Sequence, residues 1–238
     1  MNTPMVGSGR HLRALLCGTA AAALVFGTAC SNTDNGGTVG PPAKLTIAAG
    51  DLLNENVGGN IGPFVVRVTD SANVPLPNVT VNFVGSTGLT LTNASATTGQ
   101  EGTAFTAGTF SLVSGQRTVT ATVSGIATPV VFTATANPDV ASKYVIAGGN
   151  NQSGPAGTLL SDPLSVSVSD QYNNPIPNVT VSWTAPRGTI GTPAGHTAAN
   201  GRSTTEFTLP AATGTTIVSA TATINNTNVT LTFTTTSN

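Results

Sequence analysis

Two stretches of the sequence carry nearly the same pattern: "DSANVPLPNVTVNF" at residues 70–83 and "DQYNNPIPNVTVSW" at residues 170–183. Matching residues elsewhere keep an offset of 99 or 100, beginning with Lys44 and Lys143. An offset of this size is the length of a domain and exceeds the repeats of about 20 to 45 residues that build solenoids. The sequence therefore predicts one fold present twice, with a small difference in loop length.

Within each copy, apolar residues recur at every second position. The pattern is clear in "PLSVSVSD" at residues 163–170, and "PFVVRVTD" at residues 63–70 keeps the same apolar positions. Strict alternation places one face of a strand in a core and the other in water. Clusters of Asn, Pro and Gly separate these runs and are typical of turns. We therefore predict an all-β protein with two tandem antiparallel β-sandwiches.

The composition excludes two classes of protein. Hydrophobic residues make up 39% of the chain and charged residues only 7%, whereas disordered chains are polar and strongly charged. Without Arg10 and Arg13, six Lys/Arg face nine Asp/Glu, which gives a net charge of −3. A chain with this charge lacks the basic surface that nucleic acid requires.

Residues 1–29 are predicted to be a signal peptide. Arg10 and Arg13 precede the apolar run "ALLCGTAAAALVF" at residues 14–26. This run is shorter than the about 20 residues that a membrane-spanning helix needs, but it suits a secretory signal.

The stretch "GTAC" at residues 27–30 resembles the lipobox of bacterial lipoproteins, although Gly27 stands where that motif usually has Leu. The resemblance implies that Cys30 is lipidated, becomes the first mature residue and anchors the chain in a membrane. Cys17 leaves with the signal peptide, so Cys30 has no intramolecular disulfide partner. Residues 30–43 then form the lipidated cysteine and a flexible tether. Ser31 resembles the signal for sorting to the outer membrane, and a plain secreted protein is the alternative.

The repeated unit resembles the bacterial immunoglobulin-like domains of the invasin/intimin type. In each copy an Asp is followed by Pro-x-Pro-Asn-Val-x-Val-x-Phe/Trp, then a Gly-centred turn, then Val-x-Ala-Thr. The resemblance implies two immunoglobulin-like domains at residues 44–137 and 138–238, with Phe83 and Trp183 as core aromatic residues. It also implies a cell-envelope protein without enzymatic activity or cofactor, which serves as a structural spacer or an adhesion module. Because the chain stops after its last strand, binding is expected to use loops or strand edges of the second domain.

Few residues offer chemistry. His196 is the sole histidine after the signal peptide and is expected in a solvated loop; as a catalytic base it would support a hydrolase, the weakest alternative. Together with Tyr172 it forms a candidate binding site for a glycan, which is the second alternative. Glu101 and Glu206 occupy non-equivalent positions in the two copies and are not expected to meet as a glycosidase pair.

Asp70 and Asp170 each precede an Asn by three residues. Such residues can begin a calcium site, because that ion prefers carboxylate and amide oxygens. One carboxylate in each copy is too few for tight binding, and an Asx turn explains the same pattern. We therefore predict no metal.

Overall fold

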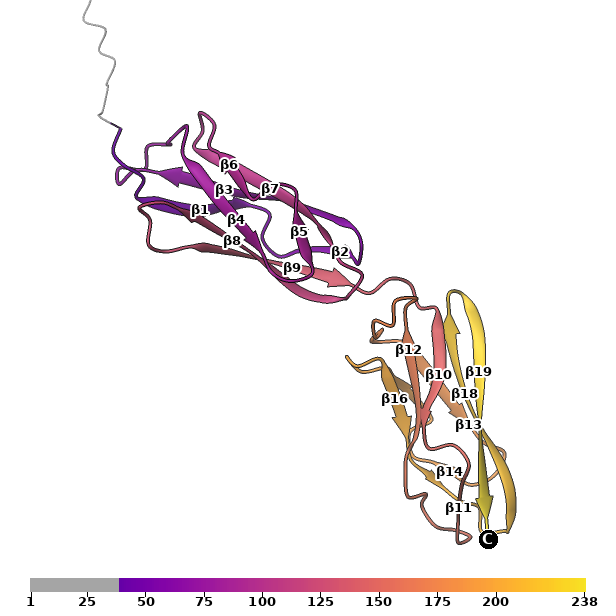
Figure 1. Ribbon diagram of the computed structural model, residues 1–238. Helices are drawn as coiled ribbons and strands as arrows, with labels where there is room; N and C mark the ends of the chain where they lie inside the picture. The colour runs from indigo at the N-terminus through magenta and orange to yellow at the C-terminus, as the bar shows by residue number, and fades with distance from the viewer. Residues whose placement is uncertain (1–38) are drawn as a thin grey trace, which may run out of the picture. The chain divides into compact units, whose positions relative to one another are not determined.

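The computed structural model describes residues 39–238, and every regular element in that part of the chain is a β-strand (Figure 1). The predicted signal peptide at residues 1–29, Cys30 and the tether up to residue 38 lie outside the described residues. Within residues 39–238, no helix has the length and hydrophobicity required to cross a bilayer.

The first sandwich consists of two sheets. The four-stranded sheet has the order β1-β3-β7-β5 and is built from β1 (Lys44–Ala49), β3 (Asn60–Thr69), β7 (Thr103–Phe110) and β5 (Leu89–Leu91). The five-stranded sheet has the order β2-β9-β8-β4-β6 and is built from β2 (Leu53–Asn56), β9 (Val130–Asn137), β8 (Gly115–Val123), β4 (Thr80–Gly85) and β6 (Ser95–Thr97). All pairs are antiparallel except β2 with β9.

The second sandwich repeats this arrangement. Its five-stranded sheet has the order β11-β19-β18-β13-β15 and is built from β11 (Gln152–Gly154), β19 (Thr227–Ser237), β18 (Gly214–Ile224), β13 (Thr180–Thr184) and β15 (Ala194–His196). The facing layer contains the sheet β10-β12-β16 and the pair β14-β17, from β10 (Lys143–Gly148), β12 (Leu164–Ser169), β16 (Arg202–Thr205), β14 (Thr189–Ile190) and β17 (Phe207–Thr208). Strand β11 pairs with β19 in parallel, as β2 does with β9. The predicted fold class is confirmed.

Each sandwich has its own core, formed by the alternating apolar residues. Phe64 packs edge-on against Phe132 in the first core, with 5.4 Å between the ring centroids, and Trp183 lies 5.5 Å from Phe233 in the second. Phe83 and Trp183 are both 2% exposed, so the prediction that they are core aromatic residues is confirmed. Burying a large apolar side chain contributes about 1.5 to 3 kcal/mol, which makes these faces the main source of stability.

The offset between the copies changes twice, from 99 to 100 after the first strand and back to 99 later, and the second change has a visible position in the fold. Asn78 and Asn178 are matched at an offset of 100, and both have positive φ, at 63°. Farther along the chain the offset is 99. This is seen in two equivalent hydrogen bonds: the N–H of Thr92 bonds the carbonyl of Ala107 in the first copy, and the N–H of Gly191 bonds the carbonyl of Glu206 in the second. The missing residue therefore lies where β5 has three residues and β14 has two.

Candidate functional site

The two predicted binding residues, Tyr172 and His196, lie in a turn and in a strand of the second sandwich. Tyr172 lies in the turn after β12, where it is 39% exposed and its N–H donates to Oδ1 of Asp170 at 2.9 Å. His196 ends the edge strand β15, with Nδ1 at 3.3 Å from Oγ1 of Thr180. Among the hydrogen bonds of residues 39–238, none joins Tyr172 to His196. Their use as one site therefore stays a prediction.

The expectation that His196 lies in a loop was wrong. The backbone of His196 pairs with that of Thr180, and Gly195 pairs with Val181. The Gly- and Pro-rich stretch "GTPAGHTAANG" gives no strand signal, but it contains a three-residue edge strand because the tertiary context can override a low β propensity.

Asp70 and Asp170 use their oxygens for backbone bonds of their own sandwiches. Oδ1 of Asp170 accepts the N–H of Tyr172 at 2.9 Å and that of Asn174 at 2.8 Å. Oδ1 of Asp70 accepts the N–H of Ala72 and of Val74, both at 2.9 Å. This is the geometry of the Asx turn. Within residues 39–238, no group of three or more His, Cys, Asp or Glu is placed to hold a metal ion.

Hydrogen bonding sets the charge state of these carboxyls. Burial alone raises the pKa of Asp170, but bonds from the side chain of Asn174 and from the N–H groups of Asp139, Asn174 and Tyr172 outweigh it and bring the pKa below its ordinary 3.8. The N–H of Val74, followed by that of Gly40, likewise lowers the pKa of Asp70. Both groups are therefore anions over the physiological range of pH.

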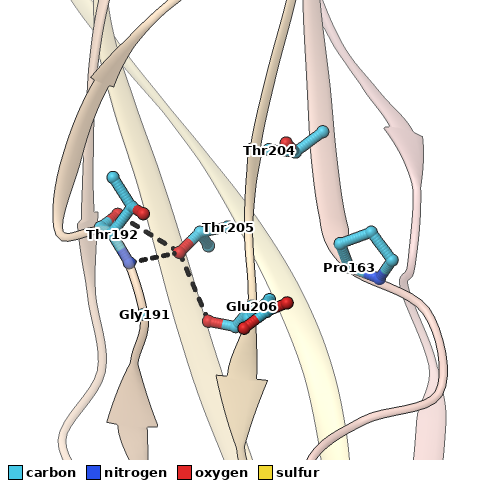
Figure 2. A pocket seen from close by; sticks show the side chains of 6 residues that line it. All are labelled: Pro163, Gly191, Thr192, Thr204, Thr205 and Glu206. Carbon is cyan, nitrogen blue, oxygen red and sulfur yellow. Dashed lines mark hydrogen bonds between the residues drawn. The ribbon is translucent and has the colours of Figure 1, made fainter.

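A polar hollow of about 360 Å³ lies on the second sandwich, beside the break between β16 and β17. It is lined by Pro163, Gly191, Thr192, Thr204, Thr205 and Glu206. In Figure 2 the side chain of Thr205 turns toward Thr192, while that of Glu206 extends on the other side, toward Pro163. The hollow thus presents threonine hydroxyls and one carboxylate.

The hydroxyl of Thr205 fixes one wall of this hollow. Its Oγ1 accepts the N–H of Thr192 at 3.0 Å and lies 3.2 Å and 3.3 Å from the carbonyl oxygens of Thr192 and Glu206. In the first sandwich Thr106 is placed in the same way, with Oγ1 at 2.9 Å from the carbonyl oxygen of Asn93. The rim differs, because Phe105 and Ala107 stand where the second copy has Thr204 and Glu206. The polar rim is therefore a feature of the second copy.

Sequence reasoning missed a pair of buried threonines. Oγ1 of Thr197 donates to the carbonyl of Ile176 at 2.7 Å and accepts the N–H of Val179 at 2.9 Å. Thr98 makes the equivalent bonds in the first sandwich. The signal was present: a Thr stands four residues before the turn glycine in both "TTGQEG" and "TAANG".

Comparison with the solved structure of InvD supports the fold. InvD of Yersinia pseudotuberculosis has a TM-score of 0.53 at 18% identity, over 82% of this chain and 56% of that chain. The adhesin InvE of the same organism has 21% identity and a TM-score of 0.38, over 81% of this chain and 58% of that chain. The D0-D1 domain of intimin has 18% identity and a TM-score of 0.35, over 82% of this chain and 98% of that chain. The chain spans little more than half the length of the InvD and InvE chains.

Comparison with protein families gives one assignment. Residues 150–234 match the family described as bacterial Ig-like domain (group 1). No match was found among curated proteins. The matched residues cover β11 to most of β19, which includes the hollow and both predicted binding residues. Residues 150–234 are therefore similar to a bacterial Ig-like domain of group 1, and the first sandwich repeats the strand order of the second.

Proposed function

We propose that the chain is a non-enzymatic, lipid-anchored protein of the bacterial cell envelope, in which the two sandwiches act as a spacer or an adhesion module. This proposal rests on the hydrogen bonds that the repeated buried polar side chains make to the backbone. Asp70 and Asp170, and Thr98 and Thr197, bond chiefly the backbone of their own sandwiches. Such side chains stabilise a shape, and they are not arranged as an acid, a base and a nucleophile.

The membrane anchor is supported by the lipobox-like residues 27–30. The test is to fractionate bacteria that produce the parent chain, Cys30→Ser or Cys17→Ser. We expect the parent and Cys17→Ser in the membrane fraction and Cys30→Ser in the soluble exported fraction. Membrane association of Cys30→Ser equal to that of the parent would contradict the anchor.

A protein partner is proposed for the adhesion role, and its contact is proposed on the first sandwich instead of the loops and strand edges of the second domain that the sequence led us to expect. Several large apolar side chains are exposed on the first sandwich, including Phe105 at 60% and Val84 at 65%. Aromatic side chains are enriched in the cores of protein interfaces, so Phe105 is the proposed contact residue. The assay measures how well bacteria that produce the parent chain adhere to host or neighbouring cells. The variant is Phe105→Thr, because Thr204 is the matching residue of the second copy. Adhesion that is the same with and without the chain would support the spacer role alone.

Carbohydrate binding is a second candidate, and the hollow at Glu206 favours it. Its volume lies within the range of about 300 to 1,000 Å³ that small-molecule sites occupy, and hydroxyls and a carboxylate can bond the hydroxyls of a sugar. A glycan array should be probed with the parent chain, Glu206→Gln and the double variant Tyr172→Ala/His196→Ala. Binding lost only in Glu206→Gln would place the site in the hollow. Binding lost only in the double variant would place it at Tyr172 and His196, and an array without signal would remove this candidate.

A further inference from the structure

A buried aspartate holds the segment through which the chain enters the second sandwich. The N–H of Asp139 donates to Oδ2 of Asp170 at 3.0 Å. Three residues later, the N–H of Ser142 donates to the carbonyl of Ser169 at 3.0 Å. Residues 139–142 are thus bonded at both ends to the end of β12 before β10 begins.

The first sandwich has the same arrangement. The N–H of Gly40 donates to Oδ2 of Asp70 at 3.1 Å, and the N–H of Ala43 donates to the carbonyl of Thr69 at 2.9 Å. In both copies Oδ1 of the same aspartate accepts N–H groups of the following turn. One carboxylate therefore fixes both a turn and the incoming chain, and the repetition of the device argues against an accident of one loop.

The side chain of Asp139 adds a second attachment. Its Oδ2 accepts a hydrogen bond from Nε2 of Gln171 at 2.9 Å, and Gln171 directly follows Asp170. Oδ2 of Asp170 also accepts Nδ2 of Asn174 at 2.7 Å, which holds the carboxylate in place. Hydrogen bonds to a charged group are roughly twice as strong as those between neutral groups.

On the other side of the connection, the chain remains bonded to the first sandwich up to Asn137. This residue ends β9 in register with Asn56, and its carbonyl accepts the N–H of Val57 at 2.9 Å. Along the backbone, Pro138 is then the single residue between the last bond to the first sandwich and the first bond to the second. Proline has a fixed φ and also restricts the backbone of the residue before it. Away from the backbone, the side chain of Asn174 also accepts the N–H of Ser114 at 2.8 Å and donates to the carbonyl of Leu112 at 2.9 Å.

We propose that Asp170 is a clamp that reduces the connection between the sandwiches to a one-residue joint at Pro138. The stiffness of the joint then depends on the Asp170 side chain, which holds the N–H of Asp139, 31 residues earlier in the sequence. Without the clamp, the backbone of residues 138–141 would have no bond to either sandwich, and only the contact between the side chains of Asp139 and Gln171 would hold this segment. The inference concerns the connection alone and stands whether or not the chain is an anchored adhesin.

The test is Asp170→Asn, with Asp70→Asn as the matched control. Asparagine keeps the shape and one acceptor oxygen for the turn, but its NH₂ group cannot accept the N–H of Asp139. Spin labels at Val84→Cys and Val145→Cys, one in each sandwich, are placed in the full chain with Cys17→Ser and Cys30→Ser. Double electron–electron resonance then measures the distribution of distances between the labels.

We expect a narrow distribution for the parent and for Asp70→Asn, and a broad one for Asp170→Asn. Equal widths in all three proteins, or equal broadening by both substitutions, would overturn the proposal. Amide hydrogen exchange decides the case even if Asp170→Asn fails to fold. In the parent, the Asp139 amide should exchange at least about tenfold more slowly than an unprotected amide, as expected for a bond to a charged acceptor. Exchange at the unprotected rate would also overturn the proposal.

Discussion

Replacing Thr197 by valine removes one hydroxyl that serves two backbone groups in the second sandwich. The side chain is 2% exposed, and its Oγ1 bonds the carbonyl of Ile176 at 2.7 Å and the N–H of Val179 at 2.9 Å. Valine has nearly the same shape, so little packing is lost. Each buried backbone group left without a partner costs about 1 to 3 kcal/mol. With some relaxation, we expect the free energy of unfolding of this sandwich to fall by about 2 to 4 kcal/mol.

The assay is urea unfolding monitored by the fluorescence of Trp183. This residue is the sole tryptophan of the chain and is 2% exposed in the second core, so its emission reports on that sandwich. With a typical slope of about 1 to 2 kcal/mol per molar urea, the midpoint should fall by roughly 1 to 4 M. The equivalent variant Thr98→Val should leave the Trp183 transition unchanged. A loss below about 0.5 kcal/mol in Thr197→Val would refute the assigned role of the hydroxyl.

Three further predictions use the same chain. Gly149→Ala should destabilise the second sandwich by at least about 2 kcal/mol, because φ is +80° and a Cβ would lie 2.3 Å from the carbonyl oxygen of Pro163. The control is Gly157→Ala, where φ is +76° but the space is open, and unfolding followed by Trp183 fluorescence should show a smaller loss of stability for it. The pKa of Asp170 in the folded protein lies below its ordinary 3.8, so the stability that this carboxylate contributes should be complete above pH 3.8 and decline as the pH falls below it. In unfolding curves measured at a series of acid pH values, Asp170→Asn should show a smaller decline than the parent. Burial raises the pKa of Tyr144 to about 12, so the stability that this phenol contributes should be complete below pH 10 and lost as the pH rises toward 12; an ultraviolet titration in which Tyr144 ionises near 10 in the folded protein would contradict this.

The architecture was predictable from the sequence because it depends on a short-range pattern. Apolar residues at every second position, as at Leu164, Val166 and Val168, are buried in the structure because successive side chains of a strand point to opposite faces. The duplication doubled the signal, since the same parity appears about one hundred residues earlier, at Phe64 and Val66.

The contacts of particular polar residues were harder to predict because they join positions far apart in sequence. Asp170 was expected to form an Asx turn, which is local, and it does so. Its second oxygen, however, bonds Asp139, and no local pattern indicates a contact over 31 residues. The hollow at Glu206 likewise forms where β16 ends, next to a loop whose length differs between the copies. Single-sequence periodicity carries no information on such a surface.

The most direct test of the central proposal is the intact mass of the protein extracted from the membranes of bacteria that produce it. The account predicts a mature chain that begins at Cys30 and carries the mass of attached fatty acyl groups. Cys30→Ser should lack that mass and leave the membrane fraction. A mature chain with an unmodified amino end, or one that begins at another residue, would contradict the claim that the two sandwiches are presented from a lipid anchor.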